Sequence, residues 1–296
     1  MNTSVLIVGA GEIGKAIALL LKKGGKSKIV QWDADPTKNL DKNTLEELMP
    51  GADIIFLCIP SRAIRKCMLR ISKKANRRQI VVSLSKGIEN ESRKTVDGVL
   101  CEFLASKQIV LMFGPMIAEE IMNNNPAAAV LACRKKRSAE KVAELFGNGL
   151  NLQYSADVRG VALSGVLKNI YSIGLGMVHG LNLGTNFRGW YVAEASKETA
   201  LVLKVLGGKM ETAYSAAGLG DLIATGFSAD SKNHMLGKDL ALSGHSDLAS
   251  EGSDSFPALN EILGNKIDNF KILSALRNII LDGKEVKDFF PKIIDG

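Results

Sequence analysis

Cysteine is scarce in this chain, and its placement excludes two kinds of structure. The 296 residues include only Cys58, Cys67, Cys101 and Cys133, with no C-x-x-C pair and no metal-ligand spacing. Two of the four fall in segments that we expect to be strands, which is typical of reduced, buried thiols in a cytoplasmic protein. The sequence therefore predicts neither a disulfide scaffold nor a metal site.

Long hydrophobic runs and linker-like segments are also lacking. No stretch of about 18 uncharged apolar residues occurs, so we expect no membrane span. The first residues, M-N-T-S-V-L-I-V, lack a basic region and lead directly into an expected strand, so we expect no signal peptide. No repeat, low-complexity tract or Pro/Ser-rich linker interrupts the chain, and its length favours two closely joined domains.

Aromatic residues make up only 5% of the chain, although its net charge of +7 invites comparison with nucleic-acid-binding proteins. Residues 62–78 are rich in Lys and Arg and contain no acidic residue. Within them Ile64, Cys67, Met68 and Ile71 recur at helical spacing, so we interpret the cations as the solvated face of an amphipathic helix. The segment has no aromatic side chain on which bases could stack. We therefore expect no nucleic-acid partner, and the positive field favours phosphorylated small molecules.

A glycine-rich turn follows the first expected strand. Residues Val5–Val8 form a short apolar run that ends in G-A-G-E-I-G, and a helical pattern follows. A second strand pattern ends at Asp33, 19 positions after Gly14. This combination is the dinucleotide-binding fingerprint, in which the glycines admit the pyrophosphate at a helix N-terminus. Asp33 would accept from the ribose hydroxyls and repel a 2′-phosphate, which favours NAD and leaves NADP as the second choice. The alternative is an ordinary glycine turn between strand and helix.

Further apolar runs follow, with the character of a parallel sheet. Residues 1–157 therefore read as a doubly wound, mostly parallel α/β domain of the Rossmann type. The runs are Ile54–Ile59, Ile80–Leu84, Ile109–Phe113 and Ala128–Ala132. Ligands in such sheets bind beyond the carboxyl ends of the strands, where this chain has I-P-S-R, S-K-G-I-E and G-P-M-I-A-E-E. Lys86 is the cation in the second of these segments, and its alternative interpretation is a solvent-exposed loop lysine.

The strand pattern stops near Val158, and helical patterns dominate residues 158–296. The segment from Ser164 to Gly184 reads as a buried helix that carries one cation, Lys168, followed by Asn169. A lysine buried among apolar groups suits proton transfer, because burial and neighbouring charges lower its pKa. The alternative is a lysine at a helix edge whose stem snorkels to water. Small residues on the same segment would let another backbone or a ligand approach closely.

Two later motifs contain polar residues in apolar or glycine-rich surroundings. Asp221 follows two glycines in A-G-L-G-D-L-I-A-T-G, and Thr225 lies one helical turn further on. An isolated aspartate at a helix start is more often a cap than a catalyst. The second motif is S-K-N-H, Ser231 to His234.

Along nearly its whole length the chain resembles the NAD(P)-dependent glycerol-3-phosphate dehydrogenase family. The matching motifs stand in the family's order: G-A-G-x-x-G, I-P-S-x-A-x-R, S-K-G-I-E, G-P-x-x-A-x-E, L-K-N, G-L-x-L-G, G-L-G-D-L-x-x-T, S-K-N and E-G. The L-K-N helix and the G-L-G-D-L turn are the discriminating pair, since many dehydrogenases share the glycine fingerprint. The resemblance implies an all-helical second domain of the 6-phosphogluconate dehydrogenase C-terminal type. It also implies interconversion of glycerol 3-phosphate and dihydroxyacetone phosphate, in glycerophospholipid precursor synthesis.

The resemblance assigns roles residue by residue. Lys168 matches the family's proton-transferring lysine. Lys86 matches a second lysine, which holds substrate and cofactor. Asp221 and Thr225 match residues that order Lys168 and the substrate hydroxyls. The positions matching cofactor contacts are Gly9, Gly11, Glu12, Ile13, Gly14, Asp33, Pro60, Lys86, Ala118, Ala249 and Glu251. The positions matching substrate contacts are Lys86, Gly114, Met116, Lys168, Asn169, Asp221, Ser231, Lys232 and Asn233.

The chain departs from the family pattern at several of these positions. Lys232 stands where the family has arginine, so a point charge replaces a fork that binds phosphate through two hydrogen bonds. Met116 replaces a usual serine, His179 replaces a usual aspartate, and T-N-F-R-G replaces D-N-T-K-A.

Two alternative functions stay open beside the dehydrogenase. One is a related reductase of another small acid, such as ketopantoate or a β-hydroxyacid. The other is a catalytically weak nucleotide-binding sensor. We expect a cytoplasmic homodimer acting on a phosphorylated small molecule.

Overall fold

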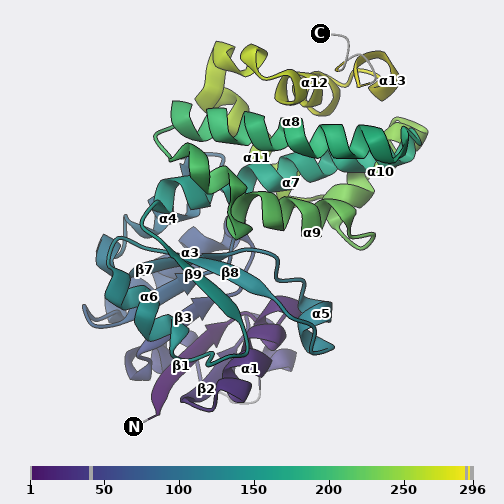
Figure 1. The fold of residues 1–296 in the computed structure, drawn as a ribbon. Coiled ribbons are helices and arrows are strands. Elements are labelled where there is room, and N and C mark those ends of the chain that lie inside the picture. The colour runs from purple at the N-terminus through teal and green to yellow at the C-terminus, as the bar shows by residue number, and fades with distance from the viewer. Residues whose placement is uncertain (1, 40–42, 291–292, 294–296) are drawn as a thin grey trace. The chain divides into compact units, whose positions relative to one another are not determined.

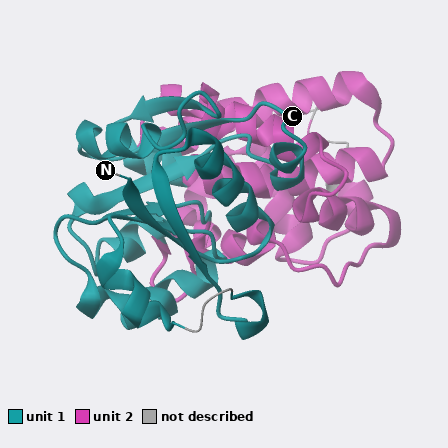
Figure 2. Ribbon diagram, turned by 90° about the horizontal axis from the view of Figure 1, so that it is seen from below, with its two compact units in different colours: residues 1–86, 95–162 teal, residues 87–94, 163–296 magenta. Residues whose placement is uncertain are grey.

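The computed structural model describes residues 2–39, 43–290 and 293. By their internal contacts these residues form two compact units (Figure 2). Unit 1 comprises residues 1–86 and 95–162, and unit 2 comprises residues 87–94 and 163–296. The predicted domain limit between residues 157 and 158 falls close to the last of these divisions and stays a prediction.

Unit 1 is built on a seven-stranded sheet with the order β2-β1-β3-β4-β7-β8-β9 (Figure 1). Its strands are β1 (Thr3–Val8), β2 (Ser27–Trp32), β3 (Ile54–Leu57), β4 (Ile80–Ser83), β7 (Ile109–Phe113), β8 (Ala128–Ala132) and β9 (Asn151–Ser155). All neighbours run parallel except β7 and β8, which are antiparallel. The prediction of a doubly wound, mostly parallel sheet is confirmed.

Two features of this sheet differ from the sequence prediction. The parallel character expected of Ala128–Ala132 is wrong, because β8 pairs with β7 in the opposite direction. A strand buried on both faces gives the same continuous apolar run in either direction. Strand β9 was not predicted, although its sequence N-L-Q-Y-S alternates polar and apolar residues, as expected of a partly exposed edge strand.

Helices cover both faces of the sheet, and each face has its own hydrophobic core. Odd residues of β1, such as Val5 and Ile7, pack with α1 (Glu12–Gly24), α5 (Ala118–Met122) and α6 (Lys136–Ala143). The even residues Leu6 and Val8 pack with α2 (Leu45–Leu48), α3 (Ile64–Ile71) and α4 (Val96–Leu100). Alternate side chains of a strand point to opposite faces, which explains this division.

The basic segment at residues 62–78 is only partly the helix that its pattern predicts. The stripe from Ile64 to Ile71 is buried on α3, as expected. The cations are less uniformly solvated than predicted, since Arg65 pairs with Glu102 and Arg70 with Glu46. The helix also ends before Arg77 and Arg78, which lie in the loop that leads into β4.

Unit 2 is mainly helical, as predicted. It contains most of α7 (Val158–Gly180) together with α8 (Gly184–Val205), α9 (Asp221–Phe227), α10 (Lys232–Ser243), α11 (Glu251–Leu263), α12 (Lys271–Ile280) and α13 (Val286–Phe289). The short strands β5 (Ile88–Glu89) and β6 (Lys94–Thr95) pair as a small second sheet. The helix predicted through Tyr191 and Val202 is α8, and both side chains are buried.

Residues 87–94 are tied to α11 although they are distant from it in sequence. The Ile88 N–H donates to Ser255 Oγ at 3.3 Å, and Asn90 Nδ2 donates to the Asp254 carbonyl at 3.2 Å. Arg93 pairs with Glu261 on the same helix.

Helix α7 forms the centre of the core of unit 2. Its length and composition would suffice to cross a membrane, but its most apolar 18-residue window is 100% buried, as in the core helix of a folded domain. Glycines let α10 pack directly against its backbone: a Cβ at Gly237 would lie 1.8 Å from the Ile173 carbonyl oxygen. On α7, a Cβ at Gly176 would lie 2.0 Å from the His234 carbonyl oxygen. The small residues of α7 therefore admit another backbone, one of the two options that its sequence left open.

Candidate active site

The glycine loop of unit 1 combines two crowded positions with an open one. A Cβ at Gly9, where φ is +109°, would lie 2.3 Å from the Cys58 carbonyl oxygen, and one at Gly14 would lie 2.0 Å from the Gly9 carbonyl oxygen. At Gly11 no atom lies within 4 Å of the Cβ position. Gly11 is the N-cap of α1, and it has no side chain to satisfy the N–H groups of the first turn. The loop can therefore receive an anion at these groups.

Asp33 is held beside this loop at the end of β2. Its Oδ2 accepts the Ala10 N–H at 2.6 Å, and its Oδ1 accepts the Asp35 N–H at 2.9 Å. The side chain of Asn39 forms two hydrogen bonds with the backbone of Asp33. Its Oδ1 accepts the Asp33 N–H at 2.6 Å, and its Nδ2 donates to the Asp33 carbonyl at 2.9 Å. The carboxylate is thus fixed next to the glycines, as the fingerprint requires.

The ends of β3, β4 and β7 position the other predicted residues of unit 1. The Ser85 hydroxyl donates to the Ile59 carbonyl, which joins the loops after β4 and β3. Lys86 Nζ lies 5.5 Å from the ring centroid of Phe113, the last residue of β7. A Cβ at Gly114 would lie 2.5 Å from the Ala128 carbonyl oxygen, so this turn requires glycine. Pro60 is exposed, whereas Met116 and Ala118 are half-buried.

Lys168 is buried in unit 2 together with an acid and a hydroxyl. Its Nζ donates to Thr225 Oγ1 at 2.7 Å and lies 3.2 Å from Asp221 Oδ1. The Thr225 hydroxyl in turn donates to Asp221 Oδ1 at 3.2 Å. The side chains of Lys168 and Asp221 are only 8% and 4% exposed, so the lysine does not snorkel to water.

A short π-helix, Ala216–Gly220, runs directly into α9 and presents Asp221 to the lysine. Gly220 takes the N-cap position of α9, so the Asp221 carboxylate pairs with Lys168 instead of capping the helix. A Cβ at Gly218 would lie 2.2 Å from the Ala213 carbonyl oxygen, which explains a glycine in this turn. Single-turn π-helices are frequent at functional sites.

The residue after the lysine begins a hydrogen-bonded chain that joins three helices. Asn169 Nδ2 donates to Glu251 Oε2 at 3.1 Å, and Asn233 Nδ2 donates to Asn169 Oδ1 at 3.0 Å. Asn233 Oδ1 accepts the Gly252 N–H at 3.0 Å. A Cβ at Gly252 would lie 2.7 Å from both the Asn169 carbonyl oxygen and Asn233 Oδ1. The E-G dipeptide therefore fits against the two asparagines only because its second residue is glycine.

The S-K-N-H motif starts α10. Ser231 is the N-cap and accepts the His234 N–H at 3.4 Å, and Lys232 is the exposed first residue of the helix. Ala249 is exposed and lies two residues before Glu251, the first residue of α11. The structure thus brings together Lys168, Asn169, Asp221, Thr225, Asn233 and Glu251 within unit 2.

Two histidines next to this network were missed by the sequence prediction of site residues. His234 Nδ1 lies 2.6 Å from the Gly226 carbonyl oxygen, and its Nε2 lies 2.8 Å from His179 Nδ1. Because a carbonyl only accepts, His234 Nδ1 donates to Gly226, and in a neutral His234 ring the Nε2 then accepts from His179 Nδ1. Burial is the main factor that lowers the pKa of each ring, and the charges of Arg188 and Lys238 lower it further. The signal available in the sequence was His234 itself, adjacent to Asn233 in the motif.

The arrangement provides an ammonium group with a carboxylate and a hydroxyl at hydrogen-bonding distance. Such an ammonium can donate a proton to a carbonyl oxygen, and its amine form can take one from an alcohol. Within residues 2–39, 43–290 and 293 no cluster of His, Cys, Asp or Glu could hold a metal ion.

Comparison with known proteins shows which family the chain resembles. The family models described as NAD-dependent glycerol-3-phosphate dehydrogenase N-terminus and C-terminus match residues 36–139 and 157–291. The enzyme named glycerol-3-phosphate dehydrogenase [NAD(P)+] from Clostridium acetobutylicum is 30% identical, over 79% of this chain and 77% of the relative. The chain belongs to the glycerol-3-phosphate dehydrogenase family. A family member from Lactiplantibacillus plantarum is 28% identical over 99% of this chain and 97% of its own length.

Solved structures of family members have the same fold. Glycerol-3-phosphate dehydrogenase from Coxiella burnetii gives a TM-score of 0.88 at 23% identity, with 100% of this chain and 99% of that chain covered. A structure titled putative 2-dehydropantoate 2-reductase, from Enterococcus faecalis, gives 0.57 at 15% identity over 97% of this chain and all of the other. The reductase considered as an alternative therefore has a related but more distant fold.

Proposed function

We propose that this chain interconverts sn-glycerol 3-phosphate and dihydroxyacetone phosphate with NAD. The observation that carries the proposal is the contact of the buried Lys168 with the buried Asp221 and the half-buried Thr225, at distances of 3.2 and 2.7 Å from the lysine nitrogen. Family membership supports the same activity, since the curated relatives are named as this dehydrogenase.

In this proposal Lys168 exchanges the proton of the C2 oxygen. The Asp221 carboxylate stabilises the ammonium form, so the lysine can donate its proton to the ketone oxygen during reduction. The Thr225 hydroxyl accepts from Lys168 and donates to Asp221, which keeps the ammonium oriented. After this transfer the amine recovers a proton from solvent. When bound, the nicotinamide supplies or accepts the hydride.

The glycine loop is proposed to hold the dinucleotide, and its geometry fits that group. Gly11 leaves open space at the uncapped start of α1, where the pyrophosphate would meet the N–H groups. Glu12, Ile13, Pro60, Ala118, Ala249 and Glu251 are proposed as further cofactor contacts. Lys86 is proposed to contact both cofactor and substrate.

The fixed position of Asp33 favours NAD over NADP. Its carboxylate is held next to Ala10, where it can accept from ribose hydroxyls and repel a 2′-phosphate. The measurement is kcat/KM with each cofactor. A clear preference for NADP would show that Asp33 does not face the ribose.

The substrate phosphate is proposed to bind at the start of α10. Ser231, Lys232 and Asn233 would contact it or the hydroxyls, and Gly114, Met116 and Asn169 are proposed as further substrate contacts. Lys232 supplies a charge there but not the paired hydrogen bonds of an arginine. The enzyme is further proposed to act as a cytoplasmic homodimer in glycerophospholipid precursor synthesis.

The deciding experiment compares substrates in steady-state NADH oxidation. Dihydroxyacetone phosphate should be turned over, whereas ketopantoate should not. Turnover of ketopantoate alone would establish the related reductase instead. Tight NADH binding without turnover of either compound would establish the nucleotide-binding sensor.

A further inference from the structure

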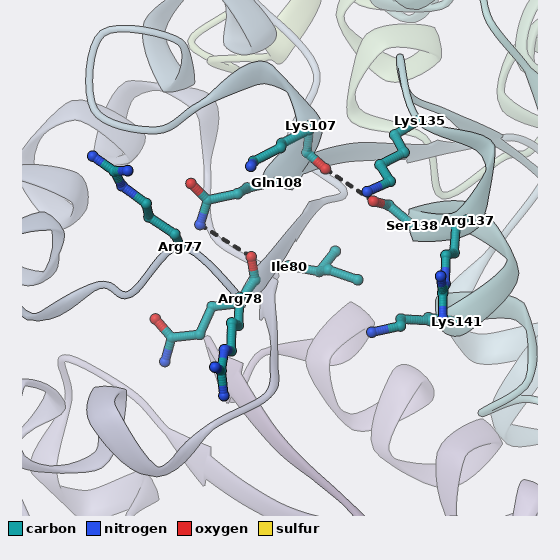
Figure 3. Close-up of a pocket in the computed structure, with 10 residues that line it drawn as sticks. Arg77, Arg78, Ile80, Lys107, Gln108, Lys135, Arg137, Ser138 and Lys141 are labelled. Atoms are coloured by element: carbon teal, nitrogen blue, oxygen red, sulfur yellow. Dashed lines mark hydrogen bonds between the residues drawn. The ribbon is translucent and has the colours of Figure 1, made fainter.

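Unit 1 contains a basic cavity at the amino ends of the parallel strands, whereas the glycine loop lies at their carboxyl ends. It has a volume of about 270 Å³ and lies where β4 and β7 begin, near the end of the antiparallel β8 (Figure 3). The glycine loop follows the carboxyl end of β1, so the two sites lie at opposite ends of the parallel strands. Neither the proposed function nor the family motifs use any residue of this cavity.

The cavity is lined by cations from three separate segments. They are Arg77, Arg78, Lys107, Lys135, Arg137 and Lys141. Figure 3 shows Arg77 and Arg78 on one side of Ile80 and the side chains of Lys135, Arg137 and Lys141 on the other. All six are exposed, and no acidic side chain lines the cavity.

These cations have no carboxylate partner, unlike four other arginines of the described chain. Arg65, Arg70, Arg93 and Arg277 each pair with an Asp or Glu. Within residues 2–39, 43–290 and 293 none of the six cavity cations is in an ion pair. Clustered charges of one sign repel one another, and a bound anion of several charges would relieve that repulsion.

The backbone around the cavity is held by buried side chains. Gln108 Nε2 donates to the Asn76 and Gln79 carbonyls at 2.9 and 3.1 Å, which ties the β7 entrance to the loop before β4. Ser138 Oγ donates to the Lys107 carbonyl at 2.9 Å, which ties α6 to the same entrance. Gln79 Nε2 donates to the Met49 carbonyl at 2.7 Å and the Ala52 carbonyl at 2.8 Å. The cations therefore project from a preorganised frame, which lowers the entropic cost of binding.

The size and chemistry of the cavity narrow the choice of ligand. Its volume is just below the range of about 300–1,000 Å³ that is typical of sites for drug-sized molecules. It has no aromatic side chain on which nucleic-acid bases could stack. Arginine and lysine in a concave site are suited to phosphoryl oxygens, because charge-assisted hydrogen bonds to them are strong.

We propose that this cavity binds a small polyphosphate, a chain of two or three phosphoryl groups, either free or carried on a nucleoside. The cations from the two sides of the cavity contact different phosphoryl groups of one chain. A single phosphate would engage only one side, so affinity rises with the number of phosphoryl groups.

The test is isothermal titration of the full-length protein, saturated with NADH so that the glycine loop is occupied. The probes are phosphate, pyrophosphate, tripolyphosphate and adenosine triphosphate. The test variant is Arg77→Gln with Arg137→Gln, which removes one cation from each side. The matched control is Lys73→Gln with Lys74→Gln, which removes two exposed charges from the same unit outside the cavity.

We expect one equivalent of tripolyphosphate to bind the wild type and the control equally. Losing two charge-assisted contacts should weaken binding to the test variant by at least about tenfold. Tighter binding of adenosine triphosphate than of tripolyphosphate would identify a nucleotide as the source of the phosphates, and the reverse order would identify a free polyphosphate. NADH oxidation should be unchanged in both variants without added polyphosphate.

Equal weakening in both double variants would overturn the proposal, since it would show a response to net charge alone. Binding of all four probes with the same affinity would also overturn it. The proposal would also be overturned if the protein bound duplex DNA tightly but did not bind tripolyphosphate. None of these readouts depends on turnover, so failure here is distinguishable from failure of the proposed dehydrogenase activity.

Discussion

At the scale of single residues, the pairing of Lys168 with Asp221 leads to the clearest prediction. Lys168→Ala removes the proposed proton donor and should lower kcat by about 10²–10⁴-fold, the usual range for a general acid or base. Binding of NADH, measured by fluorescence titration, should be nearly unchanged, because the proposed dinucleotide loop belongs to unit 1.

A matched control for this substitution is Lys197→Ala on α8. The Lys197 side chain is 64% exposed and pairs with the neighbouring Glu194, so its loss should leave kcat unchanged. If Lys168→Ala keeps more than roughly a tenth of the wild-type kcat, the lysine is not the proton donor.

Lys232 stands where the family resemblance leads us to expect an arginine. Lys232→Arg should lower KM for dihydroxyacetone phosphate, because a guanidinium makes two parallel hydrogen bonds. Lys232→Ala should raise KM by an amount corresponding to about 1.5–3 kcal/mol, as for a hydrogen bond to a charged group. Dihydroxyacetone without phosphate is the control substrate, on which both variants should match the wild type. An unchanged KM for the phosphate ester after Lys232→Ala would place the phosphate elsewhere.

At the scale of elements, the contact between α7 and α10 fixes the position of Lys168 relative to the start of α10. Gly237→Ala would place a methyl group 1.8 Å from the Ile173 carbonyl oxygen, so the helices must separate. We expect a loss of unfolding free energy of at least about 1–3 kcal/mol, as for other overpacked cores. The kcat should fall as well, since α7 carries Lys168 and α10 begins at Lys232.

Gly189→Ala on α8 is the matched control, because no atom lies within 4 Å of that Cβ position. An alanine there should raise stability by about 0.5–1 kcal/mol, the usual gain over glycine inside a helix. Urea denaturation of both variants separates the two effects. Equal stability changes would mean that the α7–α10 contact is not tightly packed.

Glu198 on α8 gives the helical unit a pH-dependent stability. It accepts the N–H groups of Ile272 and Leu273 at the start of α12, at 2.7 and 3.2 Å, and the Tyr171 hydroxyl at 3.0 Å. Burial, opposed by these hydrogen bonds, raises its pKa from 4.5 to about 7. Between these two values the folded chain binds a proton that the unfolded chain has lost, so stability falls as pH rises from about 4.5 to about 7.

The test compares the unfolding free energy of the wild type with that of Glu198→Gln across this pH range. The shift corresponds to about 3 kcal/mol of lost stability above pH 7. The glutamine variant should show a shallower fall in unfolding free energy between pH 5 and pH 8. Parallel curves for the two proteins would mean that Glu198 titrates normally in the folded state.

At the scale of the whole molecule, the net charge of +7 should speed the arrival of anionic substrates. Raising the ionic strength to about 1 M shortens the Debye length to about 3 Å and removes this long-range attraction. The kcat/KM for dihydroxyacetone phosphate should therefore fall with added salt, whereas that for uncharged dihydroxyacetone should not. If kcat/KM fell equally for both substrates, the salt would be acting on the protein itself and not on the attraction of the substrate.

The fold could be predicted largely because its signals are local. The glycine turn, the apolar strands and the apolar stripe of α3 are each encoded within a few residues, and the structure confirms them. The direction of β8 could not be predicted, because a strand buried on both faces gives the same apolar run in either direction. The polar–apolar alternation of the edge strand β9 was present in the sequence, but the prediction missed it. The loop position of Arg77 and Arg78 was missed because the basic run continues past the end of the helix.

The candidate site depends on contacts between distant residues, so less of it could be derived from the residues alone. Lys168 stood out because a single cation in an apolar helix is unusual. Its neighbours Asp221 and Thr225 lie more than fifty positions away, with Thr225 at a separation of 57, and only the family resemblance connected them. Asn39 and the two histidines were not predicted at all, since their roles arise from tertiary packing.

The attachment of residues 87–94 to α11 has a consequence for synthesis of the chain on the ribosome. Ile88 is 5% exposed in the finished protein, and its N–H partner Ser255 lies 167 residues later. At a translation rate of about 5–20 residues per second, this segment waits roughly 10 to 30 seconds before its partner helix exists. Meanwhile the sheet that flanks it in sequence is being completed. During that interval the Ile88 N–H lacks its final partner, so residues 87–94 can reach their final hydrogen bonds only after α11 has been made.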